Sequence, residues 1–245
     1  MTDQPPDLTG DAESDPESDP DSDTEYDPEY REAVVDLLGV LAYGELTAFS
    51  RLAADAELAP TLQDKAALAR QAVSEFRHFE LLEDRLRQLG ADVRAAMQPF
   101  VAAVDAFHDR TRPSTWLEGL VKAYVGDGIA TDFYREVARY LDPATQALVD
   151  EVLQDTGQAE FAVRAVRAAT ERDPSASGRL ALWGRRLVGE ALSQAQRVAA
   201  ERDALGSLLI GSDGRSGADL AEIGRMFARL TDEHTRRMGR LGLSA

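Results

Sequence analysis

The feature that most constrains the fold is a helical period of apolar residues that continues over most of the chain. After Pro28, apolar side chains recur every three to four positions, and the alternation typical of a half-buried strand does not occur. Helices of about 26 to 30 residues joined by short turns are typical of an antiparallel bundle, so the expected fold class is all-α. The predicted long helices cover 28–58, 61–89, 114–140, 143–171, 176–205 and 216–241, and a shorter, proline-interrupted helix covers 92–110.

Proline and glycine mark the ends of these helices. Asp142 precedes Pro143, a pattern typical of an N-cap followed by proline in the first turn. Ser114 is the predicted cap of the helix that follows Pro113. The predicted breaks are Ala59-Pro60, Gly90, Arg112-Pro113, Asp142-Pro143, Asp173-Pro174 and the segment GSDGRSG.

The first 26 residues differ in composition from the rest of the chain. They are rich in Asp, Glu, Ser and Pro, and such a segment cannot bury enough apolar surface to offset the entropy of ordering. We expect residues 1–26 to form a disordered, solubilising acidic tail. Residues 27–245 are expected to form a single helical domain, with a core bundle over 28–171 and extra helices over 176–241.

Charge and composition narrow the classes of function. The net charge is −17, but residues 1–30 hold 12 acidic side chains and no Lys or Arg, and no basic stripe with interleaved aromatics suggests a nucleic-acid surface. The absence of cysteine excludes disulfides and thiolate metal sites. The N-terminus is acidic rather than basic and apolar, and Asp36 and Glu45 interrupt the most apolar stretch. We therefore expect a cytoplasmic protein without a membrane span.

Acidic residues lie on the predicted apolar stripes of four successive long helices. They are Glu45, Glu75, Asp127 and Asp155, and His78 shares the stripe of Glu75. A lone buried carboxylate costs several kcal/mol unless it is paired or bound to a cation. Other interpretations stay open: Glu45 as a surface residue, Glu75 with His78 as a buried ion pair, and Asp155 as a cap or kink. A shared cation explains the whole set, because carboxylates and imidazoles are ligands of non-haem iron and manganese.

One helical hairpin occurs twice in the sequence. The segment YGELTAF at 43–49 resembles VGDGIATDF at 125–133, and EFRHFEL at 75–81 resembles DTGQAEF at 155–161. Residues three apart project from one face of a helix, and a twofold arrangement of two hairpins would bring the four acids to one centre. The aligned pairs are Glu45 with Asp127, Glu75 with Asp155, His78 with Gln158 and Glu80 with Glu160.

The order of these motifs resembles that of the ferritin-like di-iron carboxylate superfamily. The order is a single Glu, a Glu-x-x-His, a long crossover, a second single acid and an acid-x-x-polar motif. Within this superfamily, the chain resembles the tRNA-hydroxylase-like branch of actinobacterial ferritin-like proteins. The resemblance implies a ferritin-like antiparallel four-helix bundle with additional C-terminal helices. It implies metal ligation by Glu45, Glu75, His78, Asp127, Asp155 and Gln158, which stands in place of a second histidine, with Glu160 as a substitute ligand after a register shift.

The activity that the resemblance implies is that of an O₂-activating oxidase or hydroxylase of unknown substrate, with iron at two sites or with manganese. Because a neutral glutamine is a weak ligand, the second site is expected to be weak or empty. Two alternatives stay open: a non-enzymatic interaction or structural protein with a degenerate or single-metal site, and iron oxidation or storage. The resemblance also raises tRNA as a substrate, and a homodimer stays open. Tyr43, Tyr124 and Tyr134 are candidate redox or hydrogen-bonding groups, and Glu190 is a further candidate ligand.

Overall fold

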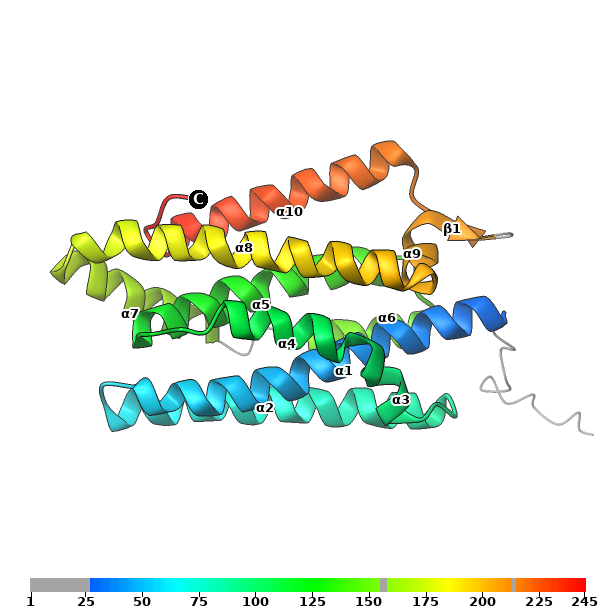
Figure 1. Ribbon diagram of the computed structural model, residues 1–245, viewed down its shortest axis with the longest axis horizontal. Helices are drawn as coiled ribbons and strands as arrows, with labels where there is room; N and C mark the ends of the chain where they lie inside the picture. Colours follow the sequence, from blue (N-terminus) through cyan, green and yellow to red (C-terminus); the bar gives the residue numbers. More distant parts are fainter. Residues whose placement is uncertain (1–26, 155–157, 213–214) are drawn as a thin grey trace, which may run out of the picture.

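The computed structural model describes residues 27–154, 158–212 and 215–245, which are almost entirely helical (Figure 1). The only strands in this described part, β1 (Gly211–Ser212) and β2 (Arg215–Ser216), pair antiparallel over two residues, so the all-α prediction is confirmed. The predicted acidic tail lies outside the described residues. The α-helices are α1 Pro28–Asp55, α2 Leu62–Gln88, α3 Val93–Met97, α4 Val101–Arg110, α5 Trp116–Ala138, α6 Pro143–Val152, α7 Gln158–Arg172, α8 Ser175–Glu201, α9 Asp203–Ile210 and α10 Leu220–Arg240, with 3-10 helices at Ala56–Leu58 and Gln98–Phe100.

Two helical hairpins form the centre of the molecule. The long helices α1 and α2 pack along each other, and α5 is followed by α6 and α7, which both pack against it (Figure 1). The short helices α3 and α4 connect the two hairpins. Outside this core, α8 packs against α5 and α4, α9 packs against α1, and α10 lies along α5.

The buried apolar side chains form two clusters, one toward each end of the bundle. On α1, Leu41 belongs to the first cluster and Leu52 to the second. On α2, Phe79 belongs to the first and Ala72 to the second. The predicted metal ligands of α1 and α2 therefore fall at the level where one apolar cluster ends and the other begins. A polar site at this level interrupts neither cluster.

The prediction of one helix over 143–171 is wrong, because α6 ends at Val152 and α7 begins at Gln158. Arg135 of α5 donates a hydrogen bond of 2.8 Å from Nη2 to the carbonyl oxygen of Leu153, just after the end of α6. The sequence Asp-Thr-Gly at 155–157 has low helix propensity and does not favour a continuous helix.

The prediction of one helix over 176–205 is also wrong. Arg202 leaves the helical conformation, with φ −133° and ψ 85°, and separates α8 from α9. Its guanidinium donates hydrogen bonds of 2.7 and 2.5 Å to the carboxylate of Asp36, which is buried on α1. A buried carboxylate requires such a partner, so this contact between distant parts of the chain fixes the position of the break.

The helix caps agree with the sequence at one predicted position and differ at another. Asp142 caps α6 as predicted, because its side chain accepts a hydrogen bond of 3.0 Å from the amide of Thr145. The prediction for Ser114 is wrong. Thr115 caps α5, and Glu118 accepts a hydrogen bond of 2.7 Å from the amide of Ser114. The side chain of Thr115 in turn accepts a hydrogen bond of 3.3 Å from the amide of Glu118, so the cap lies one residue after the predicted position.

The apolar character of α1 reflects its place in the core. A segment that begins with α1, Pro28–Leu58, is the one described segment long and apolar enough to cross a membrane, and 56% of its most apolar window is buried inside the bundle. A helix that neighbours cover on most sides needs apolar residues around most of its circumference.

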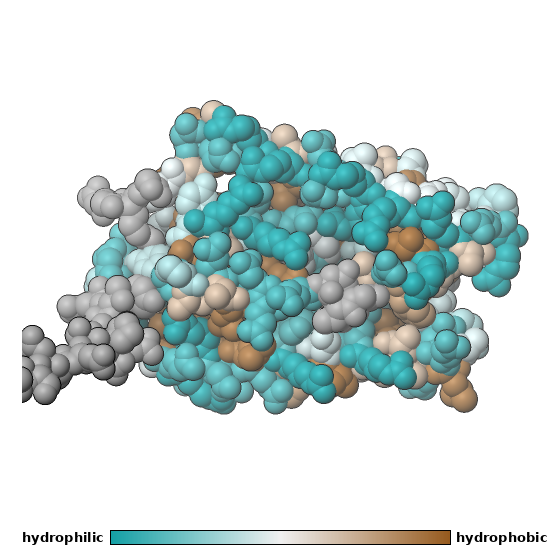
Figure 2. Space-filling model, turned by 180° about the vertical axis from the view of Figure 1, so that it is seen from behind, coloured by the Kyte–Doolittle hydropathy of each residue, from teal (hydrophilic) through white to brown (hydrophobic). Residues whose placement is uncertain are grey.

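Large exposed apolar side chains are dispersed over different helices. The most exposed are Leu220 at 88% and Leu62 at 86%, which begin α10 and α2. The face opposite to that of Figure 1 is mostly hydrophilic, with small hydrophobic areas between the polar side chains (Figure 2). Single exposed apolar residues of this kind are normal on a protein surface.

Candidate metal centre

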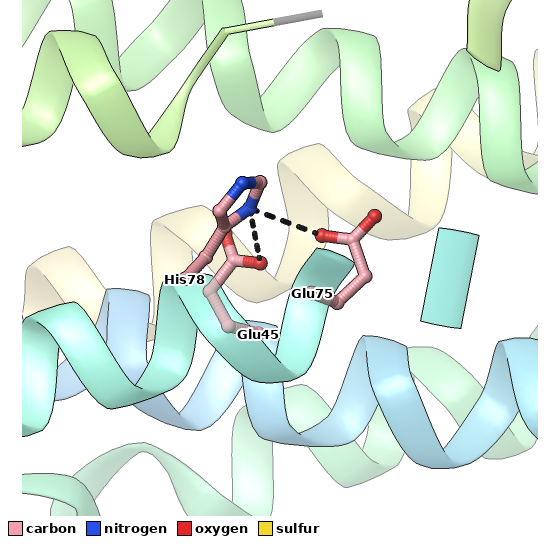
Figure 3. Close-up of side chains that lie close together, drawn as sticks. All are labelled: Glu45, Glu75 and His78. Carbon is pink, nitrogen blue, oxygen red and sulfur yellow. Dashed lines mark ion pairs between the residues drawn. The ribbon is translucent and has the colours of Figure 1, made fainter. Parts of the chain in front are cut away.

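Two neighbouring helices bring three potential metal ligands together (Figure 3). Glu75 and His78 lie three residues apart on one face of α2, and Glu45 faces them from α1. His78 Nδ1 lies 3.5 Å from Glu45 Oε2 and 3.6 Å from Glu75 Oε2. One potential ligand atom from each residue lies within 4.8 Å of the others. Atoms bound at about 2.0–2.2 Å to one first-row metal lie up to about 4.4 Å apart, so this spacing fits a shared ion after small adjustments.

The three side chains are largely removed from water. The side chains of Glu75, Glu45 and His78 are 8%, 12% and 14% exposed, respectively. Glu45 Oε2 is fully buried and has no hydrogen-bond partner among the described residues. An unpartnered buried carboxylate oxygen destabilises a protein, and a bound cation offsets that cost. The donor set of two carboxylates and one imidazole thus fits iron or manganese.

The three groups change one another's protonation. Burial raises the pKa of Glu45 well above its usual value, and the charges of Glu75 and Asp127 add to this effect while His78 opposes it. Contacts with Glu45 and then Glu75 raise the pKa of His78 to about 10, although burial acts in the opposite direction. Without metal, His78 is therefore a cation that partly balances the two acids. Metal binding would replace this proton, because ligation requires a neutral imidazole.

The three residues line a cavity of about 560 Å³ that α5, α6, α7 and α10 help to enclose. Asp127 of α5 lines the same cavity, and its side chain is exposed there. The volume is in the range of small-molecule sites, so the cavity has room for a small molecule beside the potential ligands. The aliphatic residues that line the cavity are Leu120, Ala123, Val152, Leu153, Ala159, Ala162 and Leu230.

The remaining predicted ligands lie in different surroundings. Asp155 and the side chain of Gln158 lie outside the described residues, so their part in the site stays a prediction. Glu160 is 71% exposed, forms an ion pair within α7 and is not among the residues that line the cavity. Glu190 of α8 pairs with Arg110 at 3.3 Å and does not line the cavity either.

The three candidate tyrosines occupy different positions. Tyr43 donates a hydrogen bond of 2.9 Å to Asp105 of α4. Tyr124 lines the cavity. Burial raises the pKa of Tyr134 well above 10, with a smaller contribution from the charge of Glu45. Tyr134 is therefore a neutral phenol near the potential ligands at any physiological pH.

Arg237 of α10 also lines the cavity, although no pattern on its own helix predicts this. Its Nη2 donates hydrogen bonds of 2.7 Å to Asp132 and 3.1 Å to the carbonyl oxygen of Gly128, next to Asp127. A Cβ at Gly128 would lie only 2.1 Å from Arg237 Nε, so glycine leaves the room that the guanidinium occupies. The glycine in the middle of α5 was the only signal in the sequence for this close approach.

Comparisons with known proteins agree with the architecture. A family model described as "Ferritin-like domain, actinomycetes" matches residues 28–212. Among solved structures, protein 19 with aldehyde deformylating oxidase activity from Synechococcus matches with a TM-score of 0.67 and 19% sequence identity, over 89% of this chain and 94% of that chain. A search of curated proteins found no match. The prediction of a ferritin-like helical bundle is confirmed, and the tRNA-hydroxylase-like branch stays a prediction.

Proposed function

Because the chain belongs to the ferritin-like domain family of actinomycetes, we propose that it is a cytoplasmic non-haem iron enzyme that oxidises a small substrate with O₂. The observation that carries the proposal is the convergence of Glu45, Glu75 and His78 beside a cavity. Carboxylates and imidazole on the facing helices of a bundle are typical of di-iron proteins. The similarity to a protein with aldehyde deformylating oxidase activity supports an oxidative function.

The two halves of the proposed centre differ in ligand strength. Glu45, Glu75 and His78 Nδ1 would hold the first iron, whereas Asp127, Asp155 and Gln158 would hold the second. Bound iron would supply the one-electron chemistry with O₂ that protein side chains lack. A neutral amide binds iron more weakly than an imidazole, so the second position has the lower affinity. Manganese would fit the same donors.

The surrounding residues would control water and protons. Leu120 and Val152, which are buried and line the cavity, would keep water away from part of the site. Tyr134 keeps its proton because burial raises its pKa. Its hydroxyl can therefore donate a hydrogen bond inside the bundle without adding charge to the acidic site.

One observation favours a second candidate, a single-metal or non-catalytic protein. Among the described residues, only Glu45, Glu75 and His78 form a group that could hold a metal ion. Iron storage is a third candidate, which predicts many irons per chain. We favour a small substrate over tRNA, because the chain has a net charge of −17 and would repel a polyanion.

The first experiment measures iron per chain by mass spectrometry after production in iron-replete cells. Glu75→Gln and His78→Ala are expected to weaken iron binding by more than about tenfold, because each removes a direct ligand. Glu80→Gln is the matched control, because Glu80 lies on the same helix and is exposed. Equal iron content in all four proteins would contradict the proposed site.

A second experiment tests the weaker half of the centre. Gln158→His restores an imidazole and is expected to raise the iron content toward two per chain. It is also expected to increase the rise in melting temperature on addition of ferrous ion, since ligand binding stabilises the folded state. Consumption of O₂ by the ferrous protein separates an oxidase from a passive metal protein. If neither Gln158→His nor His78→Ala changed the iron content or the melting temperature, the protein would have a ferritin-like fold without a metal site.

A further inference from the structure

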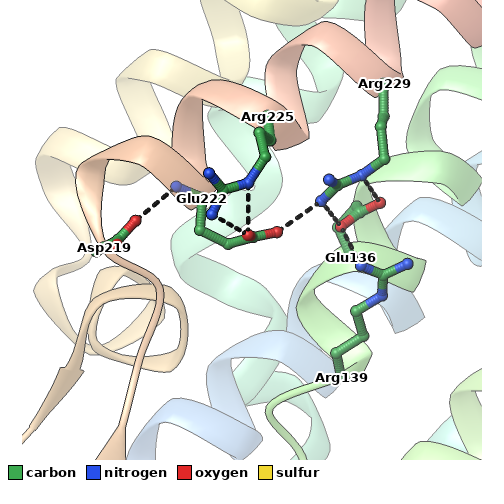
Figure 4. A network of polar contacts seen from close by, with 6 residues as sticks. All are labelled: Glu136, Arg139, Asp219, Glu222, Arg225 and Arg229. Carbon is green, nitrogen blue, oxygen red and sulfur yellow. Dashed lines mark hydrogen bonds and ion pairs between the residues drawn. The ribbon is translucent and has the colours of Figure 1, made fainter.

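The chain has 27 basic side chains, and only two of them, Lys65 and Lys122, are lysines. Arginines form the ion pairs that join the helices. Between α5 and α10, for example, Arg229 donates hydrogen bonds of 2.9 and 2.8 Å to Glu136 and one of 3.0 Å to Glu222 (Figure 4). A guanidinium keeps its proton in a protein, whereas a buried lysine loses its proton readily. The two lysines are therefore the side chains that offer an amine for covalent chemistry.

The two lysines have different surroundings. Lys65 of α2 is partly exposed, and its Nζ lies 2.8 Å from Glu57. Lys122 of α5 is 7% exposed, and its Nζ makes no hydrogen bond or ion pair in the described part of the chain. Because this Nζ has no partner but is not one of the fully buried unpartnered atoms of that part, it keeps a little accessible surface.

The amine of Lys122 is directed toward α1 and α4, and Lys122 does not line the cavity. Its Nζ lies 5.6 Å from the centroid of the Phe107 ring. A Cβ at Gly119, three residues before Lys122, would lie 3.7 Å from Asp55, and a Cβ at Gly126, four residues after it, would lie 3.8 Å from the Phe107 ring. Residues three and four apart share one face of a helix, so an acid and an aromatic ring flank Lys122 along α5.

The charges around Lys122 cancel one another. The charged groups that act on it are Arg51 and Asp55 of α1, Asp109 of α4, and Arg112 just after α4. Arg51 lies 4.0 Å from Asp109, and Arg112 lies 3.4 Å from it. Two cations and two anions leave no net charge, so the proton of Lys122 adds an unbalanced charge. Burial, which disfavours that charge, lowers the pKa of Lys122.

A second polar atom in this region also has no partner. Nδ1 of His108, the residue after Phe107, is fully buried and has no hydrogen-bond partner among the described residues. Burial, and then the charge of Lys122, lower the pKa of His108 to about 3, so the imidazole is neutral. Buried polar atoms without partners destabilise a fold, so packing does not account for either residue.

We propose that Lys122 is a nucleophile that binds a small aldehyde covalently as an imine. The lone pair of the neutral Nζ would form a bond to the carbonyl carbon. The C–N double bond would then form as the C–O bond breaks, and the oxygen would leave as water with both protons of the amine. One aldehyde and one amine give one imine and one water, without an oxidant or a reductant. A desolvated lysine beside other cations is an activated nucleophile.

The charge balance favours an imine over other products of this amine. A neutral imine leaves the site without net charge, whereas a carbamate formed with CO₂ would add a buried anion to it. An amide would also be neutral, but its formation requires an activated acyl donor with a leaving group, and the amine is largely covered. A small aldehyde needs little room and releases only water.

The test is reductive trapping of the full chain with butanal and cyanoborohydride near neutral pH, followed by peptide mass spectrometry. Lys65 is the internal control, because it is the only other lysine. Lys122 is expected to be labelled about tenfold faster than Lys65, since more of its amine is neutral. In urea the two lysines are expected to be labelled equally. Butan-1-ol with the same reductant is expected to label neither of them.

Two variants test the surroundings of the amine. Asp55→Asn removes an anion that favours the proton of Lys122 and is expected to speed its labelling about threefold. Arg51→Gln removes a cation and is expected to slow it about threefold. Glu57→Gln is the matched control, because Glu57 pairs with Lys65 and not with Lys122. Melting curves recorded by circular dichroism confirm that each variant is folded.

Labelling of Lys65 as fast as that of Lys122 in the folded protein would overturn the proposal. So would labelling of Lys122 in urea but not in the folded protein, which would leave the amine as a packing partner of the Phe107 ring. Protection of Lys122 by bicarbonate would assign a carbamate in place of the imine. The labelling needs no metal, so its outcome is independent of the proposed function.

Discussion

Asp36 and Glu45 lie little more than two turns apart on α1, and both carboxylates are buried, but their partners differ. Asp36 accepts two hydrogen bonds from the guanidinium of Arg202. Glu45 Oε2 has no hydrogen-bond partner in the described part of the chain, and shares the single imidazole of His78 with Glu75. Burial alone therefore does not distinguish a potential metal ligand from a structural ion pair. The difference is that two acids share one cationic partner at the candidate site, whereas Asp36 has the guanidinium of Arg202.

A buried lysine also affects the free energy of unfolding. Lys122 of α5 is 7% exposed, and its Nζ lies 5.6 Å from the centroid of the Phe107 ring. Burial lowers the pKa of Lys122 to about 8, while Asp55 acts in the opposite direction. His108 stays neutral, because burial lowers its pKa to about 3. The other charged groups that act on Lys122 are Arg51, Arg112 and Asp109.

The folded pKa of Lys122 lies below that of an unfolded lysine, which is 10.5. The unfolded chain then binds more protons between pH 8 and 10.5, so this group makes the protein more stable as the pH rises through that window. Lys122→Met is expected to remove this pH dependence and to raise the unfolding free energy at pH 7 by about 1–2 kcal/mol. Urea denaturation at pH 7 and pH 10 checks both effects. A destabilised variant at pH 7 would show that the cation stabilises the fold.

At the scale of secondary-structure elements, tertiary contacts decide where several helices end. The separation of α8 from α9 coincides with the ion pair between Arg202 and Asp36, and α6 ends where Arg135 binds the carbonyl oxygen of Leu153. At the first break the arginine at the helix end binds a buried carboxylate of α1, and at the second an arginine of α5 binds a carbonyl oxygen just after α6. Local propensity alone does not specify such a partner.

The contribution of the contact between Arg202 and Asp36 to stability can be measured. Arg202→Ala leaves the carboxylate of Asp36 buried without a partner, and is expected to lower the unfolding free energy by about 3 kcal/mol. The double variant Asp36→Leu with Arg202→Met is expected to recover stability to within about 1 kcal/mol of the native protein. Chemical denaturation gives all three values.

The control for Arg202→Ala is Arg197→Ala on α8. Arg197 pairs with Glu201 at 2.9 Å, and both side chains are about half exposed, at 46% and 51%. An exposed pair of this kind contributes about 0.5 kcal/mol or less. Equal losses for the two variants would mean that Asp36 does not need its arginine.

At the scale of the whole molecule, the polar site lies between two apolar clusters. The first cluster includes Leu37 and Leu82, and the second includes Val121 and Leu187. Each cluster can stabilise its own end of the bundle, so the carboxylates between them are tolerated without disrupting the core. The charge of the molecule is also unevenly distributed, since residues 1–30 hold 12 of its 44 acidic side chains.

Removal of residues 1–26 tests the predicted role of the acidic segment. The truncated protein is expected to keep the melting temperature of the full chain, because the segment has too few apolar residues to join the core. Its solubility near neutral pH is expected to fall, since the net charge becomes smaller. Differential scanning calorimetry and precipitation curves provide the measurements. A lower melting temperature, or amides in this segment that are protected from exchange, would contradict the prediction.

The sequence by itself determined the fold class and the depth of three potential ligands. Helical periodicity is a local property, and it placed Glu45, Glu75 and His78 on the buried stripes of two helices, where the structure brings their ligand atoms within 4.8 Å. Their role as metal ligands stays a prediction, as does that of Asp127, Asp155 and Gln158. These residues could be found because a carboxylate on an apolar stripe is visible in the sequence alone.

Only the tertiary structure decided how the other charges are paired. Periodicity does not show that Asp36 binds Arg202, which lies far away in the sequence, or that Arg237 lies against Gly128. It also does not show that arginines of α5 and α10 form one wall of the cavity. The physical reason is that an arginine has a long side chain whose partner depends on which helices become neighbours, and that is settled only when the whole bundle packs.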